Sequence, residues 1–394
     1  MKKFISSLGI NVLLLGIISF LTDVSSEMML AILPLFIASL GGAGIAIGLI
    51  GGIGDSVASL LKVFSGYWSD RLGKRKPFAF FGYSISSVAK LFFPFVTSWT
   101  QLLILRPIER MGKGVRDAPR DALIASSSKV EVRGKAFGFH RAMDSSGAFL
   151  GALLAFILFW FLKFEFKPIL LIAALVSFSA LFPFAWVKEK ASAKQNRREN
   201  SFRMNLKNLP SSYRRYIMVT VVFALGNFTY MFFILRARDV FQPLFPSRLA
   251  IAIPILLYCW FNIVYALFSL PGGILSDKIG RRRTLRIGYL AHVLSCLGFA
   301  LLGTLASFII MFAIYGFSFA LVEGNQRAFA SVFVEENLRG TALGAFHTAI
   351  GISTLIASVL AGILWNLSPR LTFFYGAAKG LVAAISIGSI GKKM

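Results

Sequence analysis

A short charged motif occurs twice in this chain, and each copy stands between two long apolar stretches. The first copy, GYWSDRLGKRK, occupies residues 66–76, and the second, GILSDKIGRRR, occupies residues 273–283. The two glycines, the aspartate and the basic cluster recur with an offset of 207 residues, from Gly66 to Gly273. A repeat of this length spans half of the protein, so it predicts two halves that place the same charged turn on the same side of a membrane.

The repeat extends beyond these turns. RDALIAS at residues 120–126 matches RAFAS at residues 327–331, and RGKAFG at residues 133–138 matches RGTALG at residues 339–344. The two halves therefore share an order of helices as well as a loop.

The apolar stretches predict membrane helices. Of 394 residues, 56% are hydrophobic and only 15% are charged, and the mean hydropathy is +0.72. Apolar runs of about 18 residues or more recur from end to end, and each can cross a bilayer as a helix. A membrane barrel would show short alternating segments instead. We expect twelve helices, over 8–40, 44–69, 76–97, 100–126, 134–162, 167–187, 214–241, 248–275, 283–302, 305–332, 340–366 and 371–390.

The net charge of +25 is explained by the loops. Basic residues concentrate in alternate loops, such as 71–76, 129–135 and 278–286, whereas the turns between them hold few or none. Because basic loops stay in the cytoplasm, both termini are predicted to be cytoplasmic, and a nucleic-acid partner is not needed to account for the charge. The polar stretch 188–213 is expected to be a cytoplasmic linker.

The paired motif resembles the signature loop of the major facilitator superfamily of secondary transporters, which reads G-x-x-x-D-R-x-G-R-R. The first copy matches well, and in the second Lys278 replaces the first arginine. The resemblance covers the whole chain. It implies an all-α membrane protein in which twelve transmembrane helices form two six-helix halves, 1–187 and 214–394. It also implies a monomer in the inner membrane, with its binding site between the halves near the midplane.

Two carboxylates, Asp23 and Glu27, lie in the first apolar segment. Their i, i+4 spacing puts them on one helix face. Because charge is costly in the bilayer core, they are candidate proton carriers. Two alternatives are permanent pairing with basic residues of segment 100–126, and direct contact with substrate.

Segment 100–126 carries eight ionisable residues, each of which lies three or four positions from another, so they form one stripe on a helix. Such a stripe must face water or countercharges. Its basic side could bind an organic anion or a phosphate ester. The cations that we assign to the substrate cavity are Arg106, Arg110, Lys113 and Arg116.

The resemblance implies that the first, fourth, seventh and tenth helices line the central cavity. Most of the intramembrane charge of this chain falls on those four segments. The further cavity residues that we expect are Asn227, Tyr230, Arg236, Glu323 and Asn325.

The resemblance also implies a cytoplasmic gate built on the repeated aspartates. From depth and repeat symmetry we predict the pairs Asp70–Arg120 and Asp277–Arg327. The residues assigned to gating are Gly66, Asp70, Arg71, Gly73, Arg75, Arg120, Gly273, Asp277, Gly280, Arg282 and Arg327.

The predicted function is secondary active transport of a small amphipathic or charged molecule, as proton-coupled export. The short loops resemble prokaryotic efflux members, although segment 144–151, DSSGAFLG, has the glycines of the exporter motif without its proline. The alternatives are an organic-anion or phosphate-ester transporter using the basic stripe, and a non-transporting membrane receptor. No phosphate-binding loop is present, and no motif predicts an enzyme, a metal or a cofactor. The expected partners are the substrate, protons and lipid.

Overall fold

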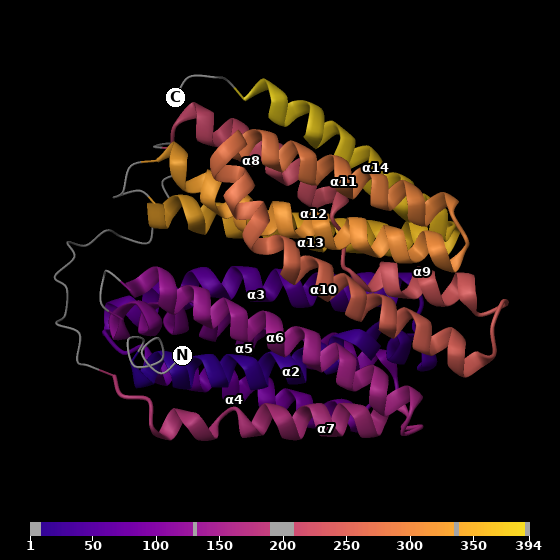
Figure 1. The fold of residues 1–394 in the computed structure, drawn as a ribbon, viewed down its shortest axis with the longest axis horizontal. Coiled ribbons are helices and arrows are strands. Elements are labelled where there is room, and N and C mark those ends of the chain that lie inside the picture. The colour runs from indigo at the N-terminus through magenta and orange to yellow at the C-terminus, as the bar shows by residue number, and fades with distance from the viewer. Residues whose placement is uncertain (1–8, 129–131, 190–208, 335–338, 391–394) are drawn as a thin grey trace. The chain divides into compact units, whose positions relative to one another are not determined.

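The computed structural model describes residues 9–128, 132–189, 209–334 and 339–390, and these residues are almost entirely helical (Figure 1). Each predicted membrane segment corresponds to one or two helices. Their bounds are α2 Ile10–Ser39, α3 Gly44–Leu72, α4 Lys76–Phe92, α5 Trp99–Ser127, α6 Arg133–Trp160, α7 Phe166–Ser179, α8 Ser211–Gly226, α9 Met231–Phe241, α10 Ser247–Ile279, α11 Arg281–Leu301, α12 Leu305–Ala330, α13 Arg339–Leu367 and α14 Pro369–Ser386.

Eleven spans in the described residues are long and apolar enough to cross a membrane, with α8 and α9 counted as one span. The twelfth segment is α5, a helix of 29 residues whose stripe of charges lowers its hydropathy. Its length is ample for a bilayer. A capping box in which Ser98 and Gln101 bond each other's backbone marks where α5 begins.

The helices form two compact units. Unit 1 comprises Met1–Phe36 and Val57–Glu199, and unit 2 comprises Ile37–Ser56 and Asn200–Met394. The predicted N-terminal half included residues 37–56, whereas packing groups them with unit 2. The first turns of α3 lie directly against α13: the two backbones are so close that a Cβ at Gly44 would lie 2.6 Å from the backbone oxygen of Gly362. The predicted linker 188–213 lies mostly outside the described residues.

Unit 1 is held together by close helix crossings at small residues. A Cβ at Gly82 of α4 would lie 2.6 Å from the backbone oxygen of Gly112 in α5. Ser86 Oγ, one turn further along α4, donates a 2.8 Å hydrogen bond to the backbone oxygen of Glu109. Small residues allow this close approach. Van der Waals packing then stabilises the helix pair, because the hydrophobic effect does not drive helices together inside a lipid bilayer. The crossing sets the charged stripe of α5 against α4.

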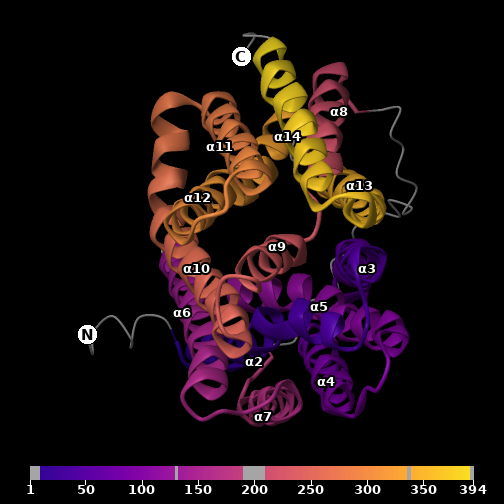
Figure 2. The ribbon, with the colours of Figure 1, turned by 90° about the vertical axis from the view of Figure 1, so that its right-hand side faces the viewer.

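Unit 2 has an aromatic interior. The rings of Phe233 and Tyr315 stack with centroids 4.0 Å apart, and so do those of Phe223 and Tyr289. Phe261 stacks on Tyr315 at 4.9 Å. The helices that carry these rings include α11 and α12, which lie side by side along their length, with α14 against α11 (Figure 2). Offset and edge contacts of this kind add about 0.5–1.5 kcal/mol per pair beyond area burial.

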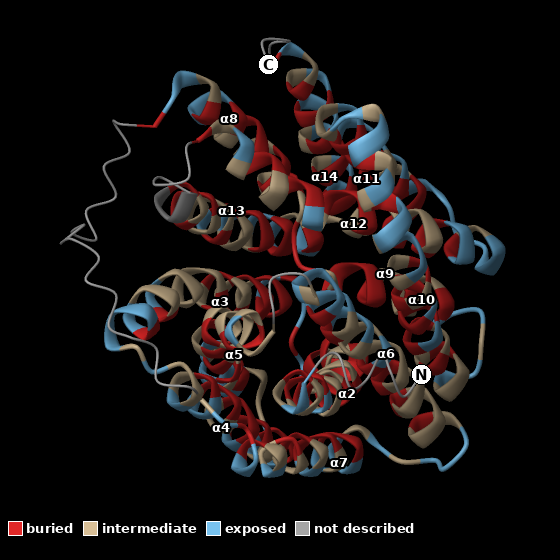
Figure 3. Cartoon of the chain, turned by 60° about the vertical axis from the view of Figure 1, so that its left-hand side comes forward, coloured by how far each residue is buried: buried red, intermediate tan, exposed pale blue. Residues whose placement is uncertain are grey.

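The predicted single helix over 214–241 is wrong, because the chain breaks into α8 and α9. Residues 227–230 are not helical, and the backbone N–H of Thr229 bonds Ser358 Oγ of α13 at 3.1 Å. Gly226 and Asn227 are residues that favour a helix end. The residues of α9 are mostly buried (Figure 3). The predicted segment 167–187 is similarly shorter, since α7 ends at Ser179 and a 3-10 turn, Phe182–Ala185, follows it.

Candidate functional site

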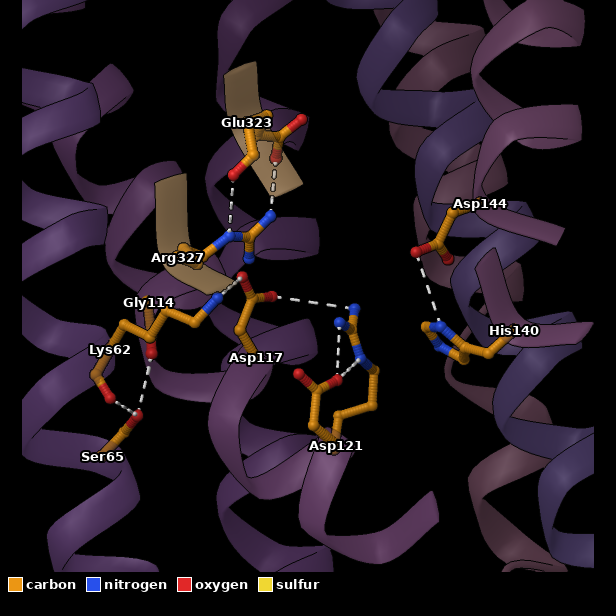
Figure 4. Close-up of polar contacts among 10 residues, drawn as sticks. Lys62, Ser65, Gly114, Asp117, Asp121, His140, Asp144, Glu323 and Arg327 are labelled. Carbon is orange, nitrogen blue, oxygen red and sulfur yellow. Dashed lines mark hydrogen bonds and ion pairs between the residues drawn. The ribbon is translucent and has the colours of Figure 1, made fainter. Parts of the chain in front are cut away.

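The stripe of α5 is a network of ion pairs within unit 1. Arg106 and Glu109 are both buried and form a pair of 2.7 Å one turn apart. Asp117 accepts from Lys62 of α3 at 3.4 Å and lies 3.7 Å from Arg120, which also pairs with Asp121 at 2.9 Å (Figure 4). Each of the three carboxylates of α5 thus has at least one cation within 4 Å.

Three other cations in unit 1, Arg116, Lys113 and Lys90, have no carboxylate within ion-pair distance among the described residues. Arg116 is buried, donates to Ser86 Oγ at 3.1 Å, and lies over the ring of Tyr83 at 4.5 Å. Lys113 makes no hydrogen bond or ion pair with any described residue and interacts with Asp23 and Asp117 only through space. Lys90 of α4 is buried and donates to Ser25 and Ser26 of α2, each at 2.9 Å.

The two carboxylates of α2 face the glycines of α6. A Cβ at Gly147 would lie 3.2 Å from the Cβ of Asp23, and one at Gly151 would lie 3.0 Å from the Cβ of Glu27. The glycines that resemble the exporter motif therefore have a packing role here. They let the backbone of α6 reach the acidic face of α2.

The residues predicted for the cavity in unit 2 have mixed surroundings. Tyr230 lies at the break between α8 and α9, next to Asn227, and its ring is 5.2 Å from that of Tyr258. Arg236 Nε bonds the backbone oxygen of Phe299 at 3.0 Å, and the amide of Asn325 bonds the oxygen of Leu321 in its own helix at 2.8 Å. Arg236 and Asn325 thus each bond a backbone oxygen of unit 2.

Glu323 is the acidic centre of unit 2. It accepts a short hydrogen bond from Tyr265 of α10 and pairs with Arg327, one turn along α12, at 3.1 Å (Figure 4). The sequence indicated Glu323 and Arg327 but not Tyr265. An aromatic run in α10 with the spacing of Tyr258, Phe261 and Tyr265, three and four residues apart, was the signal that could have pointed to it.

The predicted gate pairs are wrong in this structure. Asp70 pairs with Arg75 at 3.2 Å instead of Arg120. Arg120 is occupied by Asp117 and Asp121 on its own helix. Arg327 likewise pairs with Glu323 instead of Asp277, because a partner one helical turn away needs no matching of depth between helices.

The repeated turns have a shared backbone feature and different surroundings. Gly73 and Gly280 have φ of 63° and 90°, which favours glycine at both positions. Gly66 packs close to Ala118, whereas a Cβ at Gly273 would meet nothing within 4 Å. Arg71 lies 5.9 Å from the ring of Trp68, and Arg282 donates to the oxygen of Ile390 at 2.8 Å.

Metal-binding geometry is not found in the described part of the chain, where no three His, Cys, Asp or Glu residues converge. Cys259 and Cys296 are both buried and unbridged.

Comparison with known proteins identifies the family. The model of the Major Facilitator Superfamily matches residues 15–254 and 246–390. The chain is 46% identical to the uncharacterized MFS-type transporter MJ1317 of Methanocaldococcus jannaschii, over 95% of this chain and 93% of the relative. It is 23% identical to the multidrug resistance protein MdtH of Salmonella paratyphi C, over 86% of this chain and 82% of the relative. The crystal structure of the nucleoside transporter NupG has the same fold, with a TM-score of 0.78 at 16% identity, covering 98% of this chain and all of that one. This chain is therefore a multi-pass membrane transporter, not an enzyme, and it belongs to the major facilitator superfamily.

Proposed function

We propose that this transporter exports a small organic anion with an apolar body and that an inward flow of protons drives the export. The observation that carries the proposal is the charge pattern of α5. Each of its carboxylates has a cation within 4 Å, whereas Lys113 and Arg116 have no carboxylate at that distance among the described residues. A cation inside a membrane protein is costly unless it meets a countercharge, and an anionic substrate would supply one.

The cations assigned to the substrate cavity in α5 differ in their access. Lys113 and Arg110 are partly exposed, one turn apart on α5, whereas Arg116 and Arg106 are buried. We assign first contact with a carboxylate, sulfonate or phosphate to Lys113 and Arg110. Arg116 then adds positive charge from the buried side of α5, whereas Arg106 is held by its pair with Glu109.

Proton coupling is assigned to the α2 carboxylates, Asp23 and Glu27. Asp23 makes no hydrogen bond or ion pair with any described residue and is surrounded by the charges of Asp144, Lys113, Arg116 and Glu27. A proton on this carboxyl and an anion on Lys113 would each change the electrostatic free energy of the other. Binding of the two is then linked, as coupled transport requires.

Export is supported by the similarity to MdtH, whose name describes multidrug resistance.

A second candidate substrate is an amphipathic cation. The α2 carboxylates favour it, because they could supply the countercharge that a cation needs. The repeated Gly-x-x-x-Asp turns are assigned to gating, with Asp70–Arg75 as the pair that would break and re-form. The basic loops support cytoplasmic termini.

Inside-out membrane vesicles test the substrate class. With an acidified lumen, vesicles carrying the protein should accumulate carboxyfluorescein, and the uptake should disappear when the pH gradient is collapsed. Lys113→Met should reduce uptake at least tenfold, whereas Lys167→Met, an exposed lysine early in α7, should not. Accumulation of ethidium with no uptake of carboxyfluorescein would favour the cation exporter. Uptake of neither probe would contradict both.

A further inference from the structure

Helices α2 and α6 of unit 1 run parallel and in contact over three turns. A Cβ at Gly16 of α2 would lie 2.7 Å from the ring of Phe139 in α6. A Cβ at Gly147 would lie 2.5 Å from the backbone oxygen of Phe20, and one at Gly151 would overlap the backbone oxygen of Val24. A step of four residues along α2, from Phe20 to Val24, thus matches a step of four along α6, from Gly147 to Gly151. The two backbones touch because glycine has no side chain to separate them.

This register places a third carboxylate beside the first two. Asp144 precedes Gly147 by three residues and shares its helix face, and Gly147 packs against Phe20 and Asp23. Asp144 and Asp23 therefore lie on the contacting faces of α6 and α2, where the charge of Asp144 acts on Asp23 together with those of Lys113, Arg116 and Glu27.

A buried histidine completes the group. His140 is only 4% exposed, and its Nδ1 lies 3.5 Å from Oδ2 of Asp144, one turn away on α6 (Figure 4). The other ring nitrogen, Nε2, and the other carboxylate oxygen, Oδ1, are buried without a hydrogen-bond partner among the described residues. Arg120, Asp121 and Asp117 of α5 are the charged groups that act on His140 besides Asp144.

These carboxylates differ from the structural ones of unit 1. Asp117 lies within 4 Å of two cations, Lys62 and Arg120. Among the described residues, Asp144 has only His140 at that distance, and Asp23 has no cation there. Two neighbouring carboxylates without close cations cannot both hold a full charge cheaply in an apolar interior, and sharing one proton removes most of the cost.

We propose that Asp23 and Asp144 share the proton that is exchanged in transport and that His140 is the positioning residue of Asp144. This rests on the proposed function and moves its coupling site from α2 alone to the α2–α6 crossing. In the loaded state one proton lies on the pair. On release it leaves as H⁺, both carboxylates are then charged, and the cations whose charges act on them are Lys113 and Arg116 for Asp23 and Arg120 for Asp144.

Carbodiimide labelling tests the shared proton without any substrate. Dicyclohexylcarbodiimide reacts with protonated carboxyl groups in apolar surroundings. At pH 6.5, mass spectrometry of the purified protein should find about one label per molecule, at Asp23 or Asp144. Asp23→Asn should reduce labelling of Asp144 at least fivefold, since the amide can donate to it and the proton is no longer needed. Glu165→Gln, an exposed carboxylate before α7, should change nothing. Absence of label from both aspartates in the wild type would overturn the proposal.

Reconstituted vesicles separate this proposal from the proposed function. Asp144→Asn should reduce proton-driven accumulation of carboxyfluorescein at least tenfold and leave counterflow, the exchange of inside for outside probe without a gradient, within about twofold of the wild type. An equal fall in both assays would show a structural role and overturn the coupling site. Wild-type protein that performs neither assay would contradict the proposed function, while the labelling result would still decide whether the pair holds a proton.

Discussion

Unit 1 and unit 2 descend from one repeat but bury different chemistry. In unit 1 the helix that contains Arg120 carries a stripe of eight charges, and its pairs reach onto α3. In unit 2 the corresponding helix contains Arg327 and carries the partly exposed ion pair Glu323–Arg327 and the ring of Tyr315, which stacks on Phe233. A shared fold thus fixes where helices lie and leaves open whether charges or rings hold them together.

The largest expected effect comes from the close α2–α6 approach, which only unit 1 combines with carboxylates. Gly151→Leu would force a side chain into the backbone of Val24. We expect most of the folded protein to be lost, because overpacking against backbone cannot relax. Gly138→Leu, on the same helix with nothing within 4 Å, should purify normally. Size-exclusion chromatography after detergent extraction measures both, and equal yields would show that the crossing is loose.

The buried Arg106–Glu109 pair tests whether charge holds unit 1 together. Arg106→Met leaves Glu109 buried without its 2.7 Å partner, and we expect a loss of about 3–5 kcal/mol in unfolding free energy. The double variant Arg106→Met, Glu109→Leu removes both charges and should regain most of that loss. Thermal unfolding in detergent compares the three proteins. If the double variant is no more stable than the single one, the pair is not the source of the effect.

The ring stack of unit 2 should respond differently. Tyr315→Leu removes the partner that stacks on Phe233 at 4.0 Å while keeping an apolar side chain of moderate size. We expect a loss of about 1–3 kcal/mol, with the same loss at low and high salt, because no charge is removed. A loss of stability that depends strongly on salt would contradict the view that aromatic packing, and not charge, holds unit 2 together.

The smallest stability effect is expected at the gate. The Asp70 side chain is 56% exposed and pairs with Arg75 at 3.2 Å, so Asp70→Asn should change stability by less than about 1 kcal/mol. Transport should nevertheless slow, since the pair is assigned to the conformational change and not to the fold. A comparison of the melting midpoint with the initial rate of carboxyfluorescein uptake checks this. Unchanged uptake would remove Asp70 from the gate.

The sequence predicted the architecture well because its signals are local. Apolar length and the repeated Gly-x-x-x-Asp turn do not depend on how helices pack. The break between α8 and α9 at Asn227 was not predicted, because no proline marks it. Gly226 and Asn227 are nevertheless residues typical of a helix end.

The candidate site was harder to predict than the fold. The stripe of α5 follows from helical spacing, and so do its partners within one turn, such as Glu109 for Arg106. Partners on other helices depend on register, which periodicity does not give. For this reason Lys62 was not matched to Asp117, and Asp70 was assigned to Arg120 instead of Arg75. The spacing of Gly147 and Gly151, equal to that of Asp23 and Glu27, was the available clue to the α2–α6 register.

Ligand binding to purified protein tests the charge pattern of unit 1 most directly. Thermal unfolding would be followed with naphthalene derivatives that share one ring system and carry a carboxylate, a sulfonate, a neutral amide or a trimethylammonium group. A ligand that binds only the folded state raises the midpoint with its occupancy. We predict that the anions raise it, that the amide and the cation do not, and that Lys113→Met abolishes the rise. A rise with the cation alone, unaffected by Lys113→Met, would contradict an anion site on α5.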